Sequence, residues 1–214
     1  YSKQKLFQIS ENENKIMDFK NLEKIKNLLN KKLKKYDKIY LFDYGYLYKI
    51  PDINSLIKKN KNKFIINCQS NSYNYGFNLA TKYKFGDVIS MDEPEFRLCV
   101  NDRFSSIESL IKKNSKLFKN FKELIVTSGK YGCHVLKGKK ITFVQSIFQN
   151  LQDTTGCGDV FLAIYSLKQL KKNFSIKENI ILAHIASALH GFESGNGSTI
   201  KYEDLINKSL NILN

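Results

Sequence analysis

Two glycines and an acid lie where an apolar helical pattern begins, in the stretch Asp153–Asp159, which reads DTTGCGD. The first backbone N–H groups of a helix lack partners within it and carry the positive end of its dipole, so a helix start can hold an anion. Gly156 and Gly158 would let the backbone approach a ligand closely. An ionised acid beside such an anion hole is typical of phosphoryl transfer. We therefore expect the N–H groups of Gly156, Cys157 and Gly158 to hold a phosphate and Asp159 to act as the base. The alternative is that Asp159 only caps the helix.

The elements that must position this stretch alternate between strand and helix patterns. Apolar runs ending in polar turns predict strands within 38–45, 56–71 and 86–96, and a strand, a turn and a hairpin within 121–145. Helical spacing of apolar residues predicts helices at 19–33, 105–118, 158–170, 177–192 and 200–213. This alternation predicts an α/β fold, with a mostly parallel sheet and helices on both faces. Because no repeat or low-complexity linker marks a boundary, we expect residues 1–214 to form a single domain.

Polar turns follow the predicted strands or precede the predicted helices at five places. Functional residues of α/β folds lie at the carboxyl ends of the strands. Any one such turn is ordinary turn chemistry, but five on one rim indicate a site. The five turns are Asp43–Gly45, Asn67–Asn71, Asp92–Glu95, Thr127–Gly132 and Asp153–Asp159.

The formal net charge of +15 could by itself indicate a nucleic-acid partner. Lysine is spread through every segment and arginine is almost absent, whereas nucleic-acid readers favour arginine and place aromatic side chains in a basic groove. We therefore interpret the charge as a solvated, lysine-rich surface and expect no nucleic-acid partner. No apolar run reaches about 18 residues and no charged start precedes an apolar segment, so we expect neither a membrane span nor a signal peptide.

The cysteines and histidines show no metal-site spacing and no dense disulfide framework. They are Cys68, Cys99, Cys133 and Cys157, and His134, His184 and His190. Free thiols in a reducing cytoplasm are the expected state, which predicts a cytoplasmic protein. Because Cys157 lies at the expected helix start, we expect the dipole to lower the pKa of its thiol.

The stretch Asp153–Asp159 resembles the signature of the ribokinase-like (PfkB) carbohydrate kinase family, in which alanine usually fills the position of Cys157. Three further stretches resemble segments of that family in the same order: SMDEPEF, IVTSGKYGCHVL and AHIASALHGFESGNGST. Resemblance to the heptose-phosphate kinase branch, often fused to a nucleotidylyltransferase domain, comes from FDYGYL and NCQSNSYNYGFNLATKY. The resemblance runs from about Asp37 to Asp204.

This resemblance implies an enzyme that uses ATP and Mg²⁺ to phosphorylate a hydroxyl of a sugar or sugar phosphate, with Asp159 as the base. It also implies that Glu95 acts on the phosphates through magnesium and water. The residues implied near the nucleotide are Thr127, Gly129, Gly132, His184 and Gly195. Those implied near the sugar are Asp43, Asn67, Gln69 and Asn71.

The amino-terminal third of that family carries a Gly-Gly motif and an early Asp, and residues 1–36 contain no glycine at all. We therefore expect the carboxyl-terminal two-thirds of a kinase domain, which by itself phosphorylates no sugar. We also expect it to self-associate or to bind a missing amino-terminal segment, or a nucleotidylyltransferase domain. The alternative function is a non-catalytic nucleotide-binding or assembly module derived from such a kinase.

Overall fold

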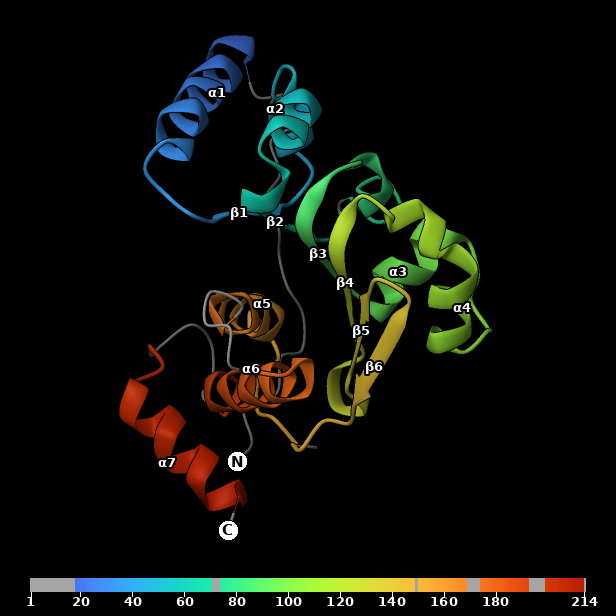
Figure 1. The fold of residues 1–214 in the computed structure, drawn as a ribbon, viewed down its shortest axis with the longest axis vertical. Coiled ribbons are helices and arrows are strands. Elements are labelled where there is room, and N and C mark those ends of the chain that lie inside the picture. Colours follow the sequence, from blue (N-terminus) through green and yellow to red (C-terminus); the bar gives the residue numbers. More distant parts are fainter. Residues whose placement is uncertain (1–17, 71–73, 149, 169–173, 193–198, 214) are drawn as a thin grey trace. The chain divides into compact units, whose positions relative to one another are not determined.

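The computed structural model describes residues 18–70, 74–148, 150–168, 174–192 and 199–213 (Figure 1). These residues form two compact units. The larger unit holds the described residues of Asn12–Val126 and His134–Ile141, and the smaller unit holds those of Thr127–Cys133 and Thr142–Asn214. Each unit is described by itself.

The strands form a sheet in the order β1-β2-β3-β4-β5-β6, so spatial order follows chain order. They are β1 (Ile39–Asp43), β2 (Phe64–Cys68), β3 (Gly86–Asp92), β4 (Phe121–Thr127), β5 (Cys133–Lys137) and β6 (Lys140–Val144). β1 pairs in parallel with β2, and β2 in parallel with β3. The strands expected from the apolar runs are confirmed, and the carboxyl ends of the first three lie along one edge of the sheet.

The helices expected at 19–33, 105–118, 158–170, 177–192 and 200–213 lie close to those positions, and two shorter helices lie before β2 and after β3. They are α1 (Phe19–Leu33), α2 (Ile53–Lys59), α3 (Glu93–Val100), α4 (Ile107–Asn114), α5 (Cys157–Lys168), α6 (Ile176–Gly191) and α7 (Tyr202–Leu213). Local capping explains several starts: Ser106 caps α4, and Asp92 with Glu95 forms a capping box at α3. Among the described residues, none of these helices is long and apolar enough to cross a membrane.

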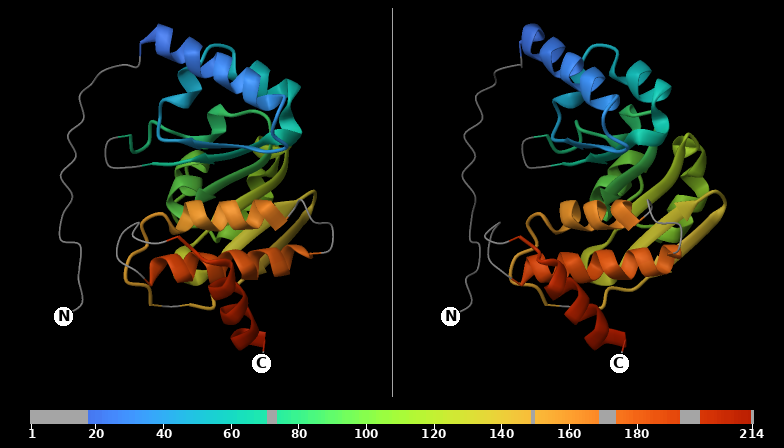
Figure 2. Two further views of the ribbon diagram at one scale, coloured as in Figure 1. Left: turned by 90° about the vertical axis from the view of Figure 1, so that its left-hand side faces the viewer. Right: turned by 60° about the vertical axis from the view of Figure 1, so that its left-hand side comes forward.

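The larger unit packs its helices on one face of its strands. Figure 2 shows α1 and α2 along the β1–β2 end of the sheet, and all four helices of this unit share one apolar cluster with the strands. Alternate strand residues such as Ile66 and Ile89 belong to that cluster. Their neighbours Ile65, Val88 and Ile125, which point to the opposite face, are also fully buried. Burial of both faces explains why these strands are continuous apolar runs rather than alternating patterns.

The smaller unit is built around the helix pair α5 and α6, with α7 beside α6. Phe161 of α5 stacks on Tyr165 and contacts the ring of His184 of α6, with centroids 5.3 Å apart for the latter pair. Phe148 and Phe192 pack edge to face, and the ammonium of Lys208 on α7 lies over both rings. The helix pair therefore has an aromatic core of its own.

Candidate active site

The stretch Asp153–Asp159 forms a turn that leads directly into α5. Gly156 has a φ of +79°, a conformation that favours glycine, and Thr155 N–H donates to the Asp153 carboxylate at 2.9 Å. Gly158 lies within the first turn of α5, and a Cβ there would meet no atom within 4 Å. Gly156 is thus required by backbone conformation, whereas Gly158 leaves open space beside the helix start.

Asp159 lies in the first turn of α5 and is half-buried. Its placement beside the glycine turn is the one that the sequence predicted. The three N–H groups expected to form the anion hole are not equivalent, because that of Cys157 already donates to the Thr154 carbonyl at 3.2 Å. Its contribution to an anion hole would require that weak bond to open.

The Cys157 side chain faces α6. Its thiol donates to the Ser187 carbonyl at 3.3 Å and lies 3.7 Å from the Asp153 carbonyl, while Ser187 Oγ donates to the Cys157 carbonyl at 2.7 Å. Burial, followed by the charge of Asp153, raises the pKa of the Cys157 thiol. The expectation of a lowered pKa is therefore wrong, because burial disfavours the thiolate more than the helix start favours it.

The carboxyl-terminal end of α6 braces the same turn. The Gly191 carbonyl accepts the N–H groups of Gln152 at 2.8 Å and Asp153 at 3.1 Å, and His190 Nε2 lies 3.0 Å from the Thr155 carbonyl. A Cβ at Gly191 would lie within 3.0 Å of Leu151 Cδ1, Asp153 O and Cys157 Sγ. Sequence reasoning missed the roles of Ser187, His190 and Gly191; the only available signal was a glycine at the end of an apolar helix.

A second polar turn follows β4 in the smaller unit. Gly129, in the short 3₁₀ turn η5 (Gly129–Tyr131), has a φ of +53° and open space where a Cβ would be. Gly132 has a φ of +120°, and a Cβ there would lie 2.3 Å from the Val144 carbonyl oxygen. The hydroxyl of Ser128, which sequence analysis did not single out, is buried with no hydrogen-bond partner in the described residues. Gly132 is thus required by the close approach of β6, whereas Gly129 has open space beside it.

His184 lies buried between α5 and α6, against Phe161. Burial lowers the pKa of His184 to about 4, so the ring is neutral at pH 7. Its Nδ1 has no hydrogen-bond partner in the described part of the chain. These observations show that His184 packs in the interface between α5 and α6. Its contact with a nucleotide stays a prediction. Gly195 lies outside the described residues.

Asp43 ends β1 in the larger unit and is fully buried. Its Oδ1 accepts the N–H groups of Gly45 and Leu47 at 2.8 and 3.0 Å, and its Oδ2 accepts the Tyr83 hydroxyl at 2.8 Å and the Lys82 ammonium at 2.6 Å. Burial by itself raises the pKa of Asp43, but Lys82, Tyr83 and Gly45 outweigh burial and hold the pKa below its usual value. Asp43 therefore organises the end of β1, and its contact with a sugar stays a prediction.

Two asparagines not singled out from the sequence brace the ends of β1 and β2. Asn78 Nδ2 donates to the carbonyls of Asp43 at 2.8 Å and Gln69 at 2.9 Å, and Asn74 Nδ2 donates to the Tyr44 carbonyl at 2.9 Å. Asn67 is buried within β2. The expected sugar-side residues Asp43, Asn67 and Gln69 thus lie at neighbouring strand ends of one unit, while Asn71 lies outside the described residues.

Glu95 is buried at the start of α3 and holds two backbone segments together. Its Oε2 accepts the N–H of Asp92 at 2.9 Å, and its Oε1 accepts the N–H of Ser70 at 2.5 Å. The described residues contain no group of three or more His, Cys, Asp or Glu side chains that could hold a metal ion. Magnesium usually keeps several waters and binds through one or two carboxylates and substrate phosphates. Because both carboxylate oxygens of Glu95 already accept backbone N–H groups, Glu95 fits a water-mediated contact with a magnesium ion that arrives with phosphates.

The chain matches the family model described as pfkB family carbohydrate kinase over residues 54–201. It is 25% identical over 198 residues to the Bifunctional protein HldE of Aliarcobacter butzleri, an alignment that covers 87% of this chain and 40% of that protein. The chain therefore spans less than half the length of that curated relative.

Solved structures show the same fold. The ribokinase of Giardia lamblia matches with a TM-score of 0.68 at 19% identity, over 88% of this chain and 63% of that one. The Arabidopsis thaliana ribokinase complexed with ribose and ATP matches with a TM-score of 0.65 at 20% identity, over 90% of this chain and 59% of that one. The α/β fold expected from the sequence is confirmed as ribokinase-like, and the chain covers only part of these proteins.

Proposed function

The chain belongs to the pfkB family of carbohydrate kinases, and from that premise we propose that it forms part of an enzyme that transfers a phosphoryl group from ATP to a hydroxyl of a sugar or sugar phosphate. The observation that carries the proposal is the position of Asp159 in the first turn of α5, directly after the turn containing Gly156. The helix start attracts a phosphate, and the adjacent carboxylate accepts the proton of the attacking hydroxyl.

The bracing of the turn by α6 supports this assignment. Backbone donors held in place before the reaction stabilise developing charge without reorganising. Ser187 and Gly191 tie the turn to α6 through hydrogen bonds of 2.7–3.1 Å. The open space beside Gly158 leaves room for the phosphate.

We assign the nucleotide to the turn after β4, where Thr127, Ser128 and Gly129 lie. The open space at Gly129, where a Cβ would meet no atom within 4 Å, leaves room for the nucleotide beside this turn. The Arabidopsis relative complexed with ribose and ATP supports the choice of nucleotide. Magnesium, when bound, would neutralise phosphate charge. Glu95, which holds the Ser70 segment through its Oε1, would contact that ion through a water.

The proposal extends to partners. The relative named as a bifunctional protein supports a second domain, such as a nucleotidylyltransferase, joined to a kinase of this type. We also propose self-association, or pairing with an amino-terminal segment, along the outer edge of β1, because an edge strand presents unpaired backbone groups.

Four free cysteines fit a reducing cytoplasm, where we place the protein. The alternative function remains a non-catalytic nucleotide-binding or assembly module derived from such a kinase.

Calorimetric titration with ATP, with and without Mg²⁺, and a coupled kinase assay over a panel of sugars and sugar phosphates test the proposal. In the full-length gene product, Asp159→Asn should keep ATP affinity but lower turnover roughly 10²–10⁴-fold. The control is Glu203→Gln, an exposed acid in the first turn of α7. Near wild-type turnover of Asp159→Asn would refute the catalytic assignment. Binding of ATP without turnover on any sugar would favour the module.

A further inference from the structure

The positive charge of the chain is unevenly distributed. Between Glu108 and Asp153 there are nine lysines, no arginine and one acidic residue, Glu123. These positions therefore contribute +8 (nine minus one) of the net charge of +15, although most of the chain's 35 basic residues lie elsewhere. A lysine-rich surface spread evenly over the protein does not account for this concentration.

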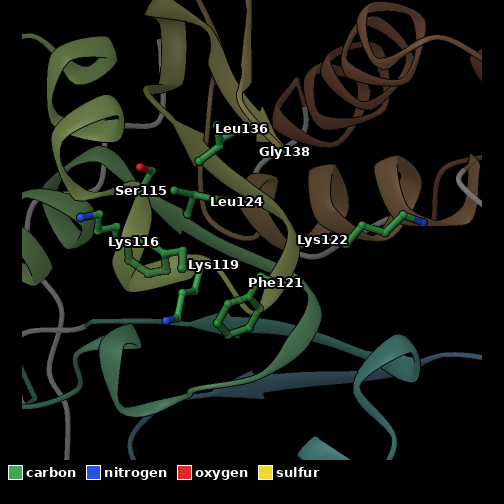
Figure 3. Close-up of a pocket in the computed structure, with 9 residues that line it drawn as sticks. Ser115, Lys116, Lys119, Phe121, Lys122, Leu124, Leu136 and Gly138 are labelled. Atoms are coloured by element: carbon green, nitrogen blue, oxygen red, sulfur yellow. The ribbon is translucent and has the colours of Figure 1, made fainter.

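A pocket of about 220 Å³ opens within this basic stretch, on the larger unit (Figure 3). Its apolar wall consists of Phe118, Phe121, Leu124 and Leu136, all buried members of the core cluster. Figure 3 shows Leu124 and Leu136 side by side. The pocket thus opens onto the hydrophobic core, so this part of the surface combines an apolar cavity with its lysines.

Lysines line the rim of the pocket. Lys116 follows the start of the 3₁₀ turn η4 (Ser115–Phe118), and Lys119 follows its end. Both are exposed, and neither makes a hydrogen bond or ion pair with the described part of the chain. Lys122 also lines the pocket but extends in another direction (Figure 3). The one acid of the stretch, Glu123, is buried and paired with Lys137 at 2.8 Å, so it does not neutralise the rim.

The pocket and the polar turn that follows β4 lie at opposite ends of that strand. Phe121 begins β4, whereas Thr127 ends it, and strands rise about 3.3 Å per residue, which separates the two ends by roughly 20 Å. Expected site residues lie at the carboxyl ends of strands, and the pocket lies at the amino end of β4. The pocket therefore has no assigned part in phosphoryl transfer.

We propose that this pocket docks an acidic segment of a partner protein, which inserts one large apolar side chain against Phe118, Phe121 and Leu136 while its carboxylates meet Lys116 and Lys119. Size favours this occupant, because pockets for drug-sized molecules are about 300–1,000 Å³ whereas this one holds little more than one side chain. Lysines are point charges, and the bidentate arginines that favour phosphate and nucleic-acid recognition are missing from the stretch. An apolar anchor in a pocket surrounded by charge is a common docking arrangement.

The test measures fluorescence anisotropy of a labelled short peptide of glutamate and aspartate with one central phenylalanine. The whole chain should bind it at low salt and bind more weakly as salt rises. The double variant Lys116→Glu with Lys119→Glu should weaken binding at least about tenfold. The matched control, Lys20→Glu with Lys24→Glu, makes the same charge change on exposed residues of α1 and should weaken binding less than about threefold. Thermal unfolding checks that both variants fold.

The inserted side chain is tested by a peptide with alanine in place of phenylalanine, which should bind about tenfold more weakly. Equal loss of binding in the two double variants would overturn the proposal, because it would indicate net charge alone. Equal affinity for the two peptides would overturn it as well. A labelled oligothymidine is the second probe. If it bound more tightly than the acidic peptide, and the Lys116→Glu with Lys119→Glu variant lost that binding, the occupant would be a nucleic acid and the proposal would be wrong. None of these outcomes depends on phosphoryl transfer.

Discussion

Cys157 and Ser187 exchange two hydrogen bonds across the α5–α6 pair: the Ser187 hydroxyl donates to the Cys157 carbonyl at 2.7 Å, and the Cys157 thiol donates to the Ser187 carbonyl at 3.3 Å. The proposed anion hole is therefore attached to a helix that begins nearly 20 residues later in the chain. Geometry at the start of α5 depends on the carboxyl-terminal half of α6.

Removing the Ser187 hydroxyl should loosen this attachment. Ser187→Ala should lower the free energy of unfolding by about 1 kcal/mol, the usual net value of one hydrogen bond, and hydrogen exchange should quicken at the amides of 153–160. The control is Ser209→Ala, whose hydroxyl donates to the Leu205 carbonyl one turn earlier within α7. Unchanged exchange in the turn would show that Ser187 does not hold it.

Gly191 should tolerate no side chain. A Cβ there would lie within 3.0 Å of three atoms, so Gly191→Ala should destabilise the protein by about 1–3 kcal/mol in urea unfolding. One of those atoms is Cys157 Sγ, so the same change in a Cys157→Ala background should cost less. As a control, Gly158→Ala fills open space in a helix and should stabilise by about 0.5–1 kcal/mol. Equal costs in both backgrounds would argue against the Cys157 contact.

His184 should make stability depend on pH. Burial lowers its pKa to about 4 in the folded protein, so the unfolded chain, with a histidine pKa near about 6.5, takes up the proton first. Stability is then full above about pH 6.5 and falls by up to about 1.4 kcal/mol per pH unit as the pH drops toward 4. Urea unfolding at pH 7.5, 6.5 and 5.5 measures this slope. His184→Met should flatten it, and an unaltered slope in that variant would assign the effect to other groups.

The Asp43–Lys82 pair should stabilise the larger unit. Asp43 is fully buried and Lys82 largely so, with 17% of its side chain exposed, and removing one partner of a buried pair costs about 3 kcal/mol or more. Asp43→Asn should approach that cost in chemical unfolding, and adding Lys82→Met should recover part of it. Because its stabilised carboxylate has a lowered pKa, the contribution of Asp43 is present above its ordinary pKa and lost as the pH falls below it.

The exposed pair of Glu108 and Lys112 is the control for that cycle. Its atoms are as close, at 2.6 Å, but both side chains are more than half exposed. Glu108→Gln should change the free energy of unfolding far less than Asp43→Asn does, because solvent screens an exposed pair. If Asp43→Asn cost no more than Glu108→Gln, burial of the pair would not be contributing to stability.

Local patterns in the sequence were sufficient to predict most of the strands and helices. The apolar runs of β1 to β4, the Ser106 cap of α4 and the glycines at the start of α5 act over a few neighbouring residues, so their spacing predicts them. The position of Asp159 in the first turn of α5 follows from the same local signals.

Side-chain partners depended on tertiary structure, because they come from residues far apart in the chain. The sequence placed Cys157 at a helix start and predicted a lowered pKa for its thiol. In the structure the thiol is packed against α6, where it contacts the Ser187 carbonyl, and burial raises its pKa instead. Asp43 was expected at a sugar, yet its carboxylate meets Lys82 and Tyr83 about 40 positions away. The spacing of residues along the chain determines which helices and strands form and in what order. The partner of each polar side chain is decided by the packing of segments that lie far apart in the chain. The physical reason is that a buried polar group without a partner is costly, so packing must supply one.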